Sequence, residues 1–455
     1  MATGLSKTKW SSDDLEVGNA ANLPIYLQYP DKKSEQAVLG VPPGQYTTLY
    51  QGNNQLNRLY FGDNLKVLSS LVRDPGVAGQ VELVYIDPPF ATGSVFQSRS
   101  QDDAYTDLLK GAAYLEFIRQ RLILLRELLS DSGSIYVHLD ANMVFAIKLI
   151  MDEVFGENNF RNLITRKKCN PKNYTRKSYG NISDYILFYT QTDNYTWNRA
   201  YEPWSPEDAE KEYTYIDGST GRRYKKVPIH APGTRRGETG QPWRGMMPPP
   251  GKHWQYRPST LEKMDQRGEI YWSPTGNPRR KIFLDDSPGK PVQDIWLDVK
   301  DAHNQNIRIT GYPTEKNPHL LERIIEASSN PGDLVLDCFC GSGTTLAVAD
   351  QLGRNWIGAD SSTEAMATTL RRFTRGTEIM GDFVTKKDVT DQVGQMSLFD
   401  DPGEVVDTRP SEQDLEHQSI EDFGFYCEVG LEEEISEDWN KWLAMAEITH
   451  DPLQM

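Results

Sequence analysis

Asp333–Thr345 reads DLVLDCFCGSGTT, and this stretch does most to decide the fold. Its apolar start predicts a buried strand, and Gly341 and Gly343 allow the backbone to turn tightly before a helix begins. Asp360 follows 19 residues after Gly341, at the end of the next predicted strand, Asn355–Gly358. In doubly wound α/β sheets a carboxylate at this spacing reaches the hydroxyls of a ribose. The stretch therefore predicts a nucleoside-binding turn.

The turn lacks two phosphate-binding patterns. Thr344 follows the second glycine and no third glycine completes the GxGxxG motif of dinucleotide enzymes. The lysine of the Walker motif is also absent, which argues against an ATPase. A nucleoside with a smaller charged attachment fits better than a pyrophosphate. A purely structural turn is the competing interpretation, because any tight strand-to-helix connection favours glycine.

A second loop follows the predicted strand Leu83–Ile86 and reads Asp87-Pro88-Pro89-Phe90. Its two prolines fix two φ angles and remove two N–H donors, so carbonyl groups stay free to accept hydrogen bonds from a ligand. Asp87 and the Pro88 carbonyl would accept the two N–H bonds of an exocyclic amine, and Phe90 would stack on its ring. A structural role competes here too, because a strand often ends at Asp-Pro.

The surrounding sequence alternates strands with helices. Apolar residues recur at steps of three and four from Leu115 to Leu129, which predicts an amphipathic helix. Further strands are predicted at Ser134–Leu139 and Tyr185–Tyr189, and a further helix at His319–Ile325. This alternation is typical of an α/β fold. Beyond Arg375 the sequence has no convincing compact pattern.

Charge is distributed unevenly along the 455 residues, whose net charge is −16. The segment 378–455 holds 21 acidic and 4 basic residues, so the rest of the chain is close to neutral. Residues 161–281 hold 23 basic and 12 acidic residues, and such a density of cations neutralises nucleic-acid phosphates. Residues 201–294 contain 13 of the 27 prolines, which indicates a turn-rich insertion.

Composition also excludes several classes of protein. No apolar run reaches eighteen residues, and the N-terminus lacks the apolar core of a signal peptide, so we expect neither a membrane span nor secretion. The four cysteines are too few for a disulfide framework and lack zinc-binding spacing. We therefore expect a cytoplasmic protein without a metal.

Five motifs in one order resemble those of the bacterial amino-methylating DNA methyltransferases. They are YFGDNLKVL at Tyr60–Leu68, VYIDPPF at Val84–Phe90, TGYPTEKNPHLLERII at Thr310–Ile325, DCFCGSGTT at Asp337–Thr345 and WIGAD at Trp356–Asp360. The cofactor turn comes after the amine-binding loop, which is the circularly permuted order of the beta class. That class includes the modification (Mod) subunits of type III restriction systems. The resemblance covers roughly residues 46–200 and 305–376.

The resemblance implies a Rossmann-like α/β sheet that binds S-adenosylmethionine at its carboxyl edge. Its cofactor residues would be Asp337, Phe339, Gly341, Gly343 and Thr344, with Asp360 on the ribose, Asp63 near the adenine, and Thr314 and Lys316 close by. Its catalytic residues, which take the target base, would be Asp87, Pro88, Pro89 and Phe90. The sequence departs from the family pattern at Asn317, between the lysine and the proline, and at Cys338, where proline is common.

The reaction implied is methylation of adenine N6 in a base flipped out of double-stranded DNA. Cytosine N4 stays open, although an aspartate-led loop usually accompanies adenine in this family. Cytosine C5 is disfavoured because no Pro-Cys occurs. Two more hypotheses stay open, namely a non-catalytic DNA-recognition subunit and a methyltransferase for RNA or protein amines.

The sequence predicts five regions and several partners. The regions are an extension at 1–45, a first catalytic part at 46–194, a target-recognition insertion at 195–305, a second catalytic part at 306–376 and an acidic segment at 377–455. A restriction subunit and a second copy of the chain are expected partners. Gln395–Phe399 resembles the short peptides that bind the bacterial sliding clamp, although a chance apolar anchor is the simpler interpretation.

Overall fold

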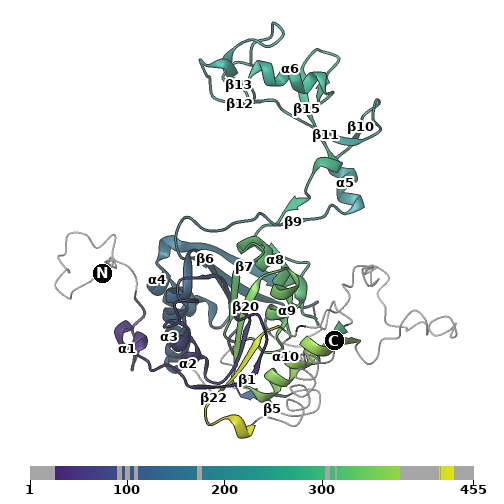
Figure 1. The fold of residues 1–455 in the computed structure, drawn as a ribbon. Coiled ribbons are helices and arrows are strands. Elements are labelled where there is room, and N and C mark those ends of the chain that lie inside the picture. The colour runs from purple at the N-terminus through teal and green to yellow at the C-terminus, as the bar shows by residue number, and fades with distance from the viewer. Residues whose placement is uncertain are drawn as a thin grey trace, which may run out of the picture. The chain divides into compact units, whose positions relative to one another are not determined.

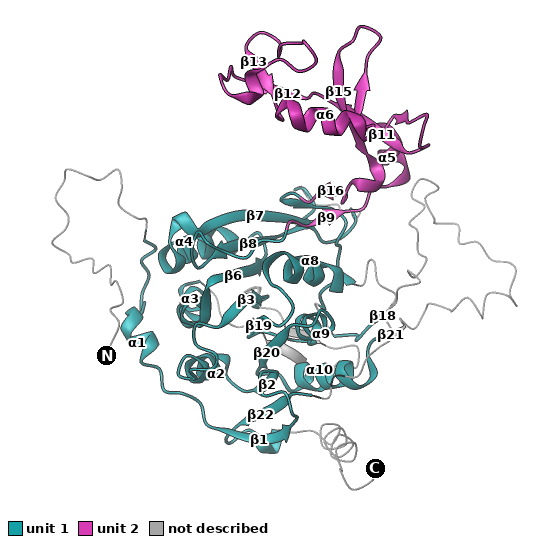
Figure 2. Cartoon of the chain, turned by 45° about the horizontal axis from the view of Figure 1, so that its top comes forward, with its two compact units in different colours: residues 1–198, 293–455 teal, residues 199–292 magenta. Residues whose placement is uncertain are grey.

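The structure is a computed structural model that describes residues 26–89, 95–97, 103–106, 111–171, 177–302, 308–312, 315–379, 420 and 422–434. The chain divides into two compact units, one of residues 1–198 with 293–455 and one of residues 199–292 (Figure 2). The insertion expected at 195–305 contains the second unit. Residues 293–302 and the residues before 199 belong to the larger unit.

The larger unit is built on a ten-stranded sheet (Figure 1). In spatial order its strands are β1 (Tyr46–Gln51), β22 (Gly424–Glu428), β2 (Arg58–Phe61), β20 (Asn355–Asp360), β19 (Leu334–Asp337), β3 (Val81–Ile86), β6 (Leu129–Leu139), β8 (Ser183–Thr190), β7 (Phe160–Lys167) and β17 (Ile295–Trp296). The strands from β22 to β6 run parallel to their neighbours, whereas β1 and β8 run antiparallel to theirs. This topology confirms the predicted Rossmann-like fold.

Helices cover both faces of this sheet (Figure 2). On one face lie α2 (Asn64–Leu71), α3 (Ala112–Leu128) and α4 (Val144–Phe155), and on the other lie α8 (Pro318–Ser328), α9 (Thr344–Gln351) and α10 (Thr363–Arg375). The predicted apolar stripe is confirmed for Ile118, Leu122 and Leu125, which are fully buried in α3, whereas Leu115 is partly buried and Leu129 already belongs to β6. The short strand pairs β4 (Val95–Gln97) with β5 (Asp103–Thr106) and β18 (Arg308–Ile309) with β21 (Glu378–Ile379) complete the unit.

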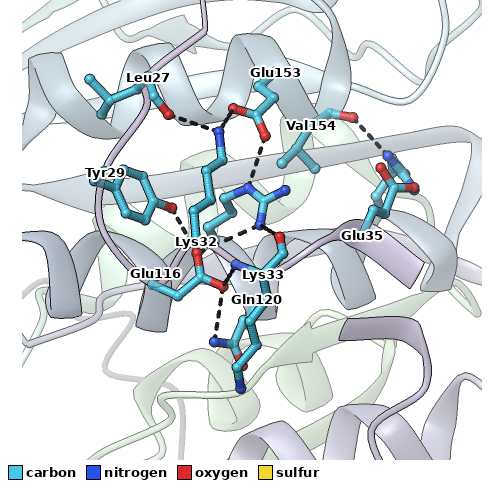
Figure 3. A network of polar contacts seen from close by, with 11 residues as sticks. Leu27, Tyr29, Lys32, Lys33, Glu35, Glu116, Gln120, Glu153 and Val154 are labelled. Atoms are coloured by element: carbon cyan, nitrogen blue, oxygen red, sulfur yellow. Dashed lines mark hydrogen bonds and ion pairs between the residues drawn. The ribbon is translucent and has the colours of Figure 1, made fainter. Parts of the chain in front are cut away.

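The described part of the N-terminal segment packs against α3 and α4 through buried polar contacts (Figure 3). It includes α1 (Glu35–Leu39). The Tyr29 hydroxyl donates to Glu116 at 2.8 Å, and Lys32 pairs with Glu153 at 2.6 Å. Glu153 also pairs with Arg119 at 2.9 Å. Residues expected to form a loose extension therefore cover one helical layer.

Strand β22 differs from the sequence-based expectation, which found no compact pattern beyond Arg375. It lies between β1 and β2, and its Phe425 and Cys427 side chains are fully buried. The sequence did not predict β22 because the strand has only five residues, lies in an acidic segment and pairs with strands that are far away in the sequence. No helix in the described ranges is long and apolar enough to span a membrane.

The smaller unit has its own core. Its elements are β9 (Tyr201–Glu202), α5 (Pro206–Glu212), β10 (Tyr215–Ile216), β11 (Arg223–Val227), β12 (His230–Pro232), β13 (Lys252–Trp254), α6 (Pro258–Gln266), β14 (Ile270–Trp272), β15 (Pro278–Phe283) and β16 (Lys290–Pro291). Four strands form a sheet in the order β10-β11-β15-β14. Trp243 and Trp254 pack edge to face with ring centres 6.1 Å apart, against Leu261 and Met264 of α6.

Candidate active site

A cavity of about 750 Å³ opens at the carboxyl edge of the parallel strands of the larger unit. Parallel strands bring their carboxyl ends to one edge, and this is where ligands bind in α/β sheets. The cavity wall contains most of the residues predicted from the sequence, namely Asp63, Asp87, Pro88, Pro89, Lys316, Asp337, Phe339, Gly341, Thr344 and Asp360. Phe90 and Thr314 lie outside the described residues.

The glycine turn connects β19 to α9. The Gly341 amide donates to the Asp360 carboxylate at 3.0 Å, and a φ of +52° favours glycine at this position. Gly343 begins α9 at a φ of +72°, and a Cβ there would lie 2.7 Å from the Thr369 side chain. Gly343 is absent from the cavity wall, so the structure gives it a packing role in the turn.

Asp337 is buried at the base of the cavity. Its carboxylate accepts from the Phe339 amide at 3.0 Å and from the Thr345 hydroxyl at 2.6 Å. Burial raises the pKa of Asp337 to about 7, and the nearby charges of Asp87 and Asp360 add to this shift. Burial also raises the pKa of Asp360. Seven acidic and three basic residues line the cavity, and this excess of acidic groups favours a cationic ligand.

Replacing Asp337 with asparagine should change how stability depends on pH. A carboxyl whose pKa is higher in the folded state stabilises the fold below its unfolded pKa, and this contribution is lost as pH rises through the folded pKa. Between pH 5 and pH 8 the wild type should therefore lose roughly 3 kcal/mol of unfolding free energy relative to Asp337→Asn. Urea unfolding of both proteins at pH 5 and pH 8 without ligand measures the two free energies of unfolding. An equal change with pH in the wild type and in Asp337→Asn would contradict the prediction.

Asp87 lies at the end of β3, and its two carboxylate oxygens have different surroundings. One oxygen forms an ion pair with Lys316, a residue of the YPTEKN segment. The other oxygen, Oδ1, is buried and accepts no hydrogen bond from any described residue, and His138 Nδ1 lies 4.0 Å from it. A buried carboxylate oxygen without a partner is costly. This oxygen therefore points to a ligand that donates an N–H bond.

A chain of buried polar residues lies behind Asp87 and was not predicted from the sequence. The Tyr85 hydroxyl is 2.8 Å from His138 Nδ1, and His138 Nε2 is 2.9 Å from Asp184. Arg166 contacts both oxygens of Asp184, at 2.9 and 2.7 Å, and also pairs with Asp301. Burial alone would raise the pKa of Asp184, but His138 and Arg166 hold this pKa well below its usual range. The available signal was charged residues inside otherwise apolar strands.

A second unpredicted pair supports the glycine turn from α10. Arg372 is buried, pairs with Glu315, and donates to the Ser342 carbonyl at 2.7 Å. Glu315 is also buried and accepts from the Thr310 hydroxyl at 2.8 Å. The pair thus connects the segment that carries Lys316 to the turn that carries Gly341.

Asp63 lies at the end of β2 and begins α2, where its side chain accepts from the Leu65 amide at 2.9 Å. Arg121 of α3 donates to Asp63 at 3.1 Å and stacks over the Phe117 ring, 3.5 Å from its centre. Burial lowers the pKa of Arg121 to about 10. Among the cavity-lining cysteines, burial raises the thiol pKa of Cys338 and Cys340, so neither is a ready nucleophile.

The fold and this cavity define a Rossmann-like α/β protein in which the Asp-Pro-Pro loop and the glycine turn line one cavity. Residues 81–371 match the N6/N4 family described as DNA methylase. The chain belongs to this family and is a DNA methyltransferase related to restriction-modification enzymes.

The chain is similar to individual proteins of known sequence or structure. The chain is 45% identical to the type II methyltransferase M.EcaI of Enterobacter cloacae, over 84% of this chain and 87% of the relative. It is 29% identical to the StyLTI Mod subunit of Salmonella typhimurium, a type III restriction-modification enzyme, over 67% of this chain but only 51% of that protein. The solved structure of the M1.HpyAVI–SAM complex aligns with 69% of this chain and 98% of its own, at 16% identity and a TM-score of 0.38.

Proposed function

We propose that this protein transfers a methyl group from S-adenosylmethionine to the N6 amine of an adenine flipped out of double-stranded DNA. The observation that carries the proposal is the Asp87 Oδ1 atom, which is buried and accepts no hydrogen bond from a described residue. Asp87 lines the same cavity as Gly341 and Asp360. An amine acceptor and a nucleoside-binding turn therefore share one cavity.

The described residues fit S-adenosylmethionine. Asp360, at the end of β20 and fixed by the Gly341 amide, would hold the ribose hydroxyls. Phe339 and Thr344 line the same wall, and the acidic character of the cavity suits a sulfonium and an ammonium group. When bound, this cofactor supplies an electrophilic methyl carbon. Thr314 stays a predicted contact.

The amine-binding loop would orient the target. Asp87 Oδ1 and the Pro88 carbonyl would accept the two N–H bonds of the amine and direct its nitrogen into the cavity, which is an orientation effect. Lys316 keeps the other Asp87 oxygen occupied, so the carboxylate presents a single acceptor. Pro89 restricts the loop, and Phe90 is predicted from the sequence to stack on the base.

Mass spectrometry of the product nucleosides tests the proposal. We expect N6-methyladenine after incubation of the full chain with S-adenosylmethionine and unmethylated genomic DNA, and none with Asp87→Ala. Exclusive N4-methylcytosine would replace adenine with cytosine as the substrate. An absence of any methylated nucleoside would favour a non-catalytic recognition subunit or a missing partner chain.

The second unit is proposed to recognise the DNA sequence. It presents cationic and aromatic side chains together, as in Lys226, whose ammonium lies 3.5 Å from the ring centres of both Tyr215 and Tyr271. Tyr215 is 43% exposed. Basic groups of this kind contact phosphates, and neighbouring polar groups read base edges.

Exchange of residues 199–292, the second unit, for the corresponding segment of a relative should therefore change the methylated site and leave the methylated atom unchanged. Sequencing that detects methylated bases in treated genomic DNA measures both. A chimera that folds and methylates the original site would assign recognition to the larger unit.

Partner proteins remain predictions. A restriction subunit is consistent with the similarity to Mod subunits, although the chain spans about half the length of that relative. The clamp-binding peptide at Gln395–Phe399 lies outside the described residues, and a second copy of the chain stays an expectation. A cytoplasmic location is proposed because cellular DNA is the substrate.

A further inference from the structure

Strand β22 brings the acidic C-terminal segment to the edge of the cavity. It runs parallel to β2, with Phe61 opposite Cys427, so Glu428 follows next to Gly62 at the carboxyl end. A Cβ at Gly62 would lie 2.6 Å from a Glu428 carboxylate oxygen, so this position has room only for glycine. The fit between the two strands is therefore close where they reach the cavity.

Glu428 holds the segment that carries Asp63. One of its oxygens accepts from the Asp63 amide at 2.9 Å, and the other pairs with Lys66 of α2. Glu428 is only 9% exposed, and Lys66 and Asp63 line the cavity beside it. Both carboxylate oxygens are thus used to fix the start of α2, where Asp63 faces the cavity.

The turn after β22 continues the cavity wall with Leu431 and Glu434. Glu432, in the 3-10 turn Glu432–Glu434, fixes this turn by accepting from the Thr47 hydroxyl at 2.9 Å and the Gly430 amide at 2.7 Å. Residues from two ends of the sequence therefore build one wall.

The order of the strands indicates which part of the cofactor this wall would meet. Along the carboxyl edge, Asp87 follows β3, Asp360 ends β20, and Asp63 follows β2, with β22 next in line. If the transferred methyl group lies toward Asp87 and the cofactor ribose lies at Asp360, the adenine ring of the cofactor extends past β2 to β22. An apolar side chain such as Leu431 then lies where a planar ring needs a packing surface.

We propose that the wall formed by Glu428, Leu431 and Glu434 is the adenine end of the cofactor site, with Leu431 packing on the adenine ring and Glu428 acting as a positioning residue for Asp63 and Lys66. This inference rests on the proposed cofactor. It assigns to the acidic segment a binding role that its composition does not suggest.

Calorimetric binding of S-adenosylmethionine to full-length variants tests the inference. Leu431→Ala and Glu428→Ala should each raise the Kd about tenfold or more, and Glu428→Gln should raise it less because it keeps an acceptor for the Asp63 amide. At saturating cofactor kcat should stay within about twofold, and the Kd for DNA should not change. Glu433→Gln, in the same turn but absent from the wall, is the matched control.

Two further measurements locate the effect and check the fold. The increase in Kd should also be seen with methylthioadenosine, which keeps the adenosine and the methylthio group of the cofactor but lacks its amino-acid part. An effect on S-adenosylmethionine without one on methylthioadenosine would overturn the assignment, and so would unchanged Kd values for folded Leu431→Ala and Glu428→Ala. Thermal unfolding verifies folding, and Leu431→Ala keeps the test valid if Glu428→Ala is unstable. A wild type that binds neither ligand would instead refute the proposed cofactor.

Discussion

Alanine at position 87 should lower the single-turnover rate of methyl transfer by about 10²–10³-fold, the range seen when one preorganised hydrogen-bonding group is removed from an active site. The reason is local, because Asp87 Oδ1 is the buried acceptor proposed for the target amine and Lys316 occupies the other oxygen. Binding of S-adenosylmethionine should persist, since Asp360 and the glycine turn are untouched.

The conservative variant makes this experiment sharper. Asp87→Asn retains an oxygen of similar position but loses the charge and weakens the ion pair with Lys316. Its rate should fall between those of the wild type and Asp87→Ala. Rapid-quench assays with radiolabelled cofactor measure the rate, and calorimetry measures cofactor binding. A rate within tenfold of wild type for folded Asp87→Ala would assign the amine acceptor to another residue.

Replacing Arg166 with methionine should lower the free energy of unfolding by about 3–5 kcal/mol, which is the cost of leaving a buried charge without its partner. Arg166 is 1% exposed, and it contacts both oxygens of the buried Asp184 as well as Asp301. Methionine fills a similar volume, so the loss would come from the charge. Urea denaturation monitored by circular dichroism measures it.

Strand β7 supplies the matched control. Arg161→Met changes the same residue type five positions earlier. The Arg161 side chain is 16% exposed and also donates to the Thr190 hydroxyl at 2.9 Å, but its acidic partner, Asp193, has an 87% exposed side chain. Removing Arg161 leaves no buried carboxylate unpaired, so this variant should lose clearly less free energy of unfolding than Arg166→Met. The double variant Arg166→Met with Asp184→Asn should recover part of the loss. Equal effects of Arg161→Met and Arg166→Met would show that burial of the network contributes nothing.

Local patterns were sufficient to predict the frame of the larger unit. The stretch 333–345 predicted β19, the glycine turn and α9, because an apolar run and two glycines each determine structure over a few residues. The steps of three and four from Leu115 predicted α3 for the same reason. The cavity contains most of the predicted residues because parallel strands share one carboxyl edge.

The remaining features depend on contacts that no local pattern encodes. Arg166, Asp184 and Arg372 are charged, and a sequence alone assigns such residues to the surface until their buried partners are known. The tryptophans of the second unit are also residues whose location the sequence alone does not determine. Trp243 and Trp254 could serve a DNA-binding surface or a core, and the structure places both in the core.

The position of β22 has a consequence for how the chain folds during its synthesis. Strand β2 pairs with β20 on one side and β22 on the other, and Lys66 and Glu428, which join these elements, are 362 positions apart. Contacts between residues so distant in the sequence slow folding. A strand whose neighbour has not yet been synthesised exposes unpaired backbone N–H and C=O groups along one edge. During synthesis on the ribosome, one edge of β2 would lack its neighbour until residues 424–428 have emerged. The adenine end of the proposed cofactor site would then form only after the other nine strands of the ten-stranded sheet have been synthesised, so a nascent chain could not bind the methyl donor fully before β22 joins the sheet.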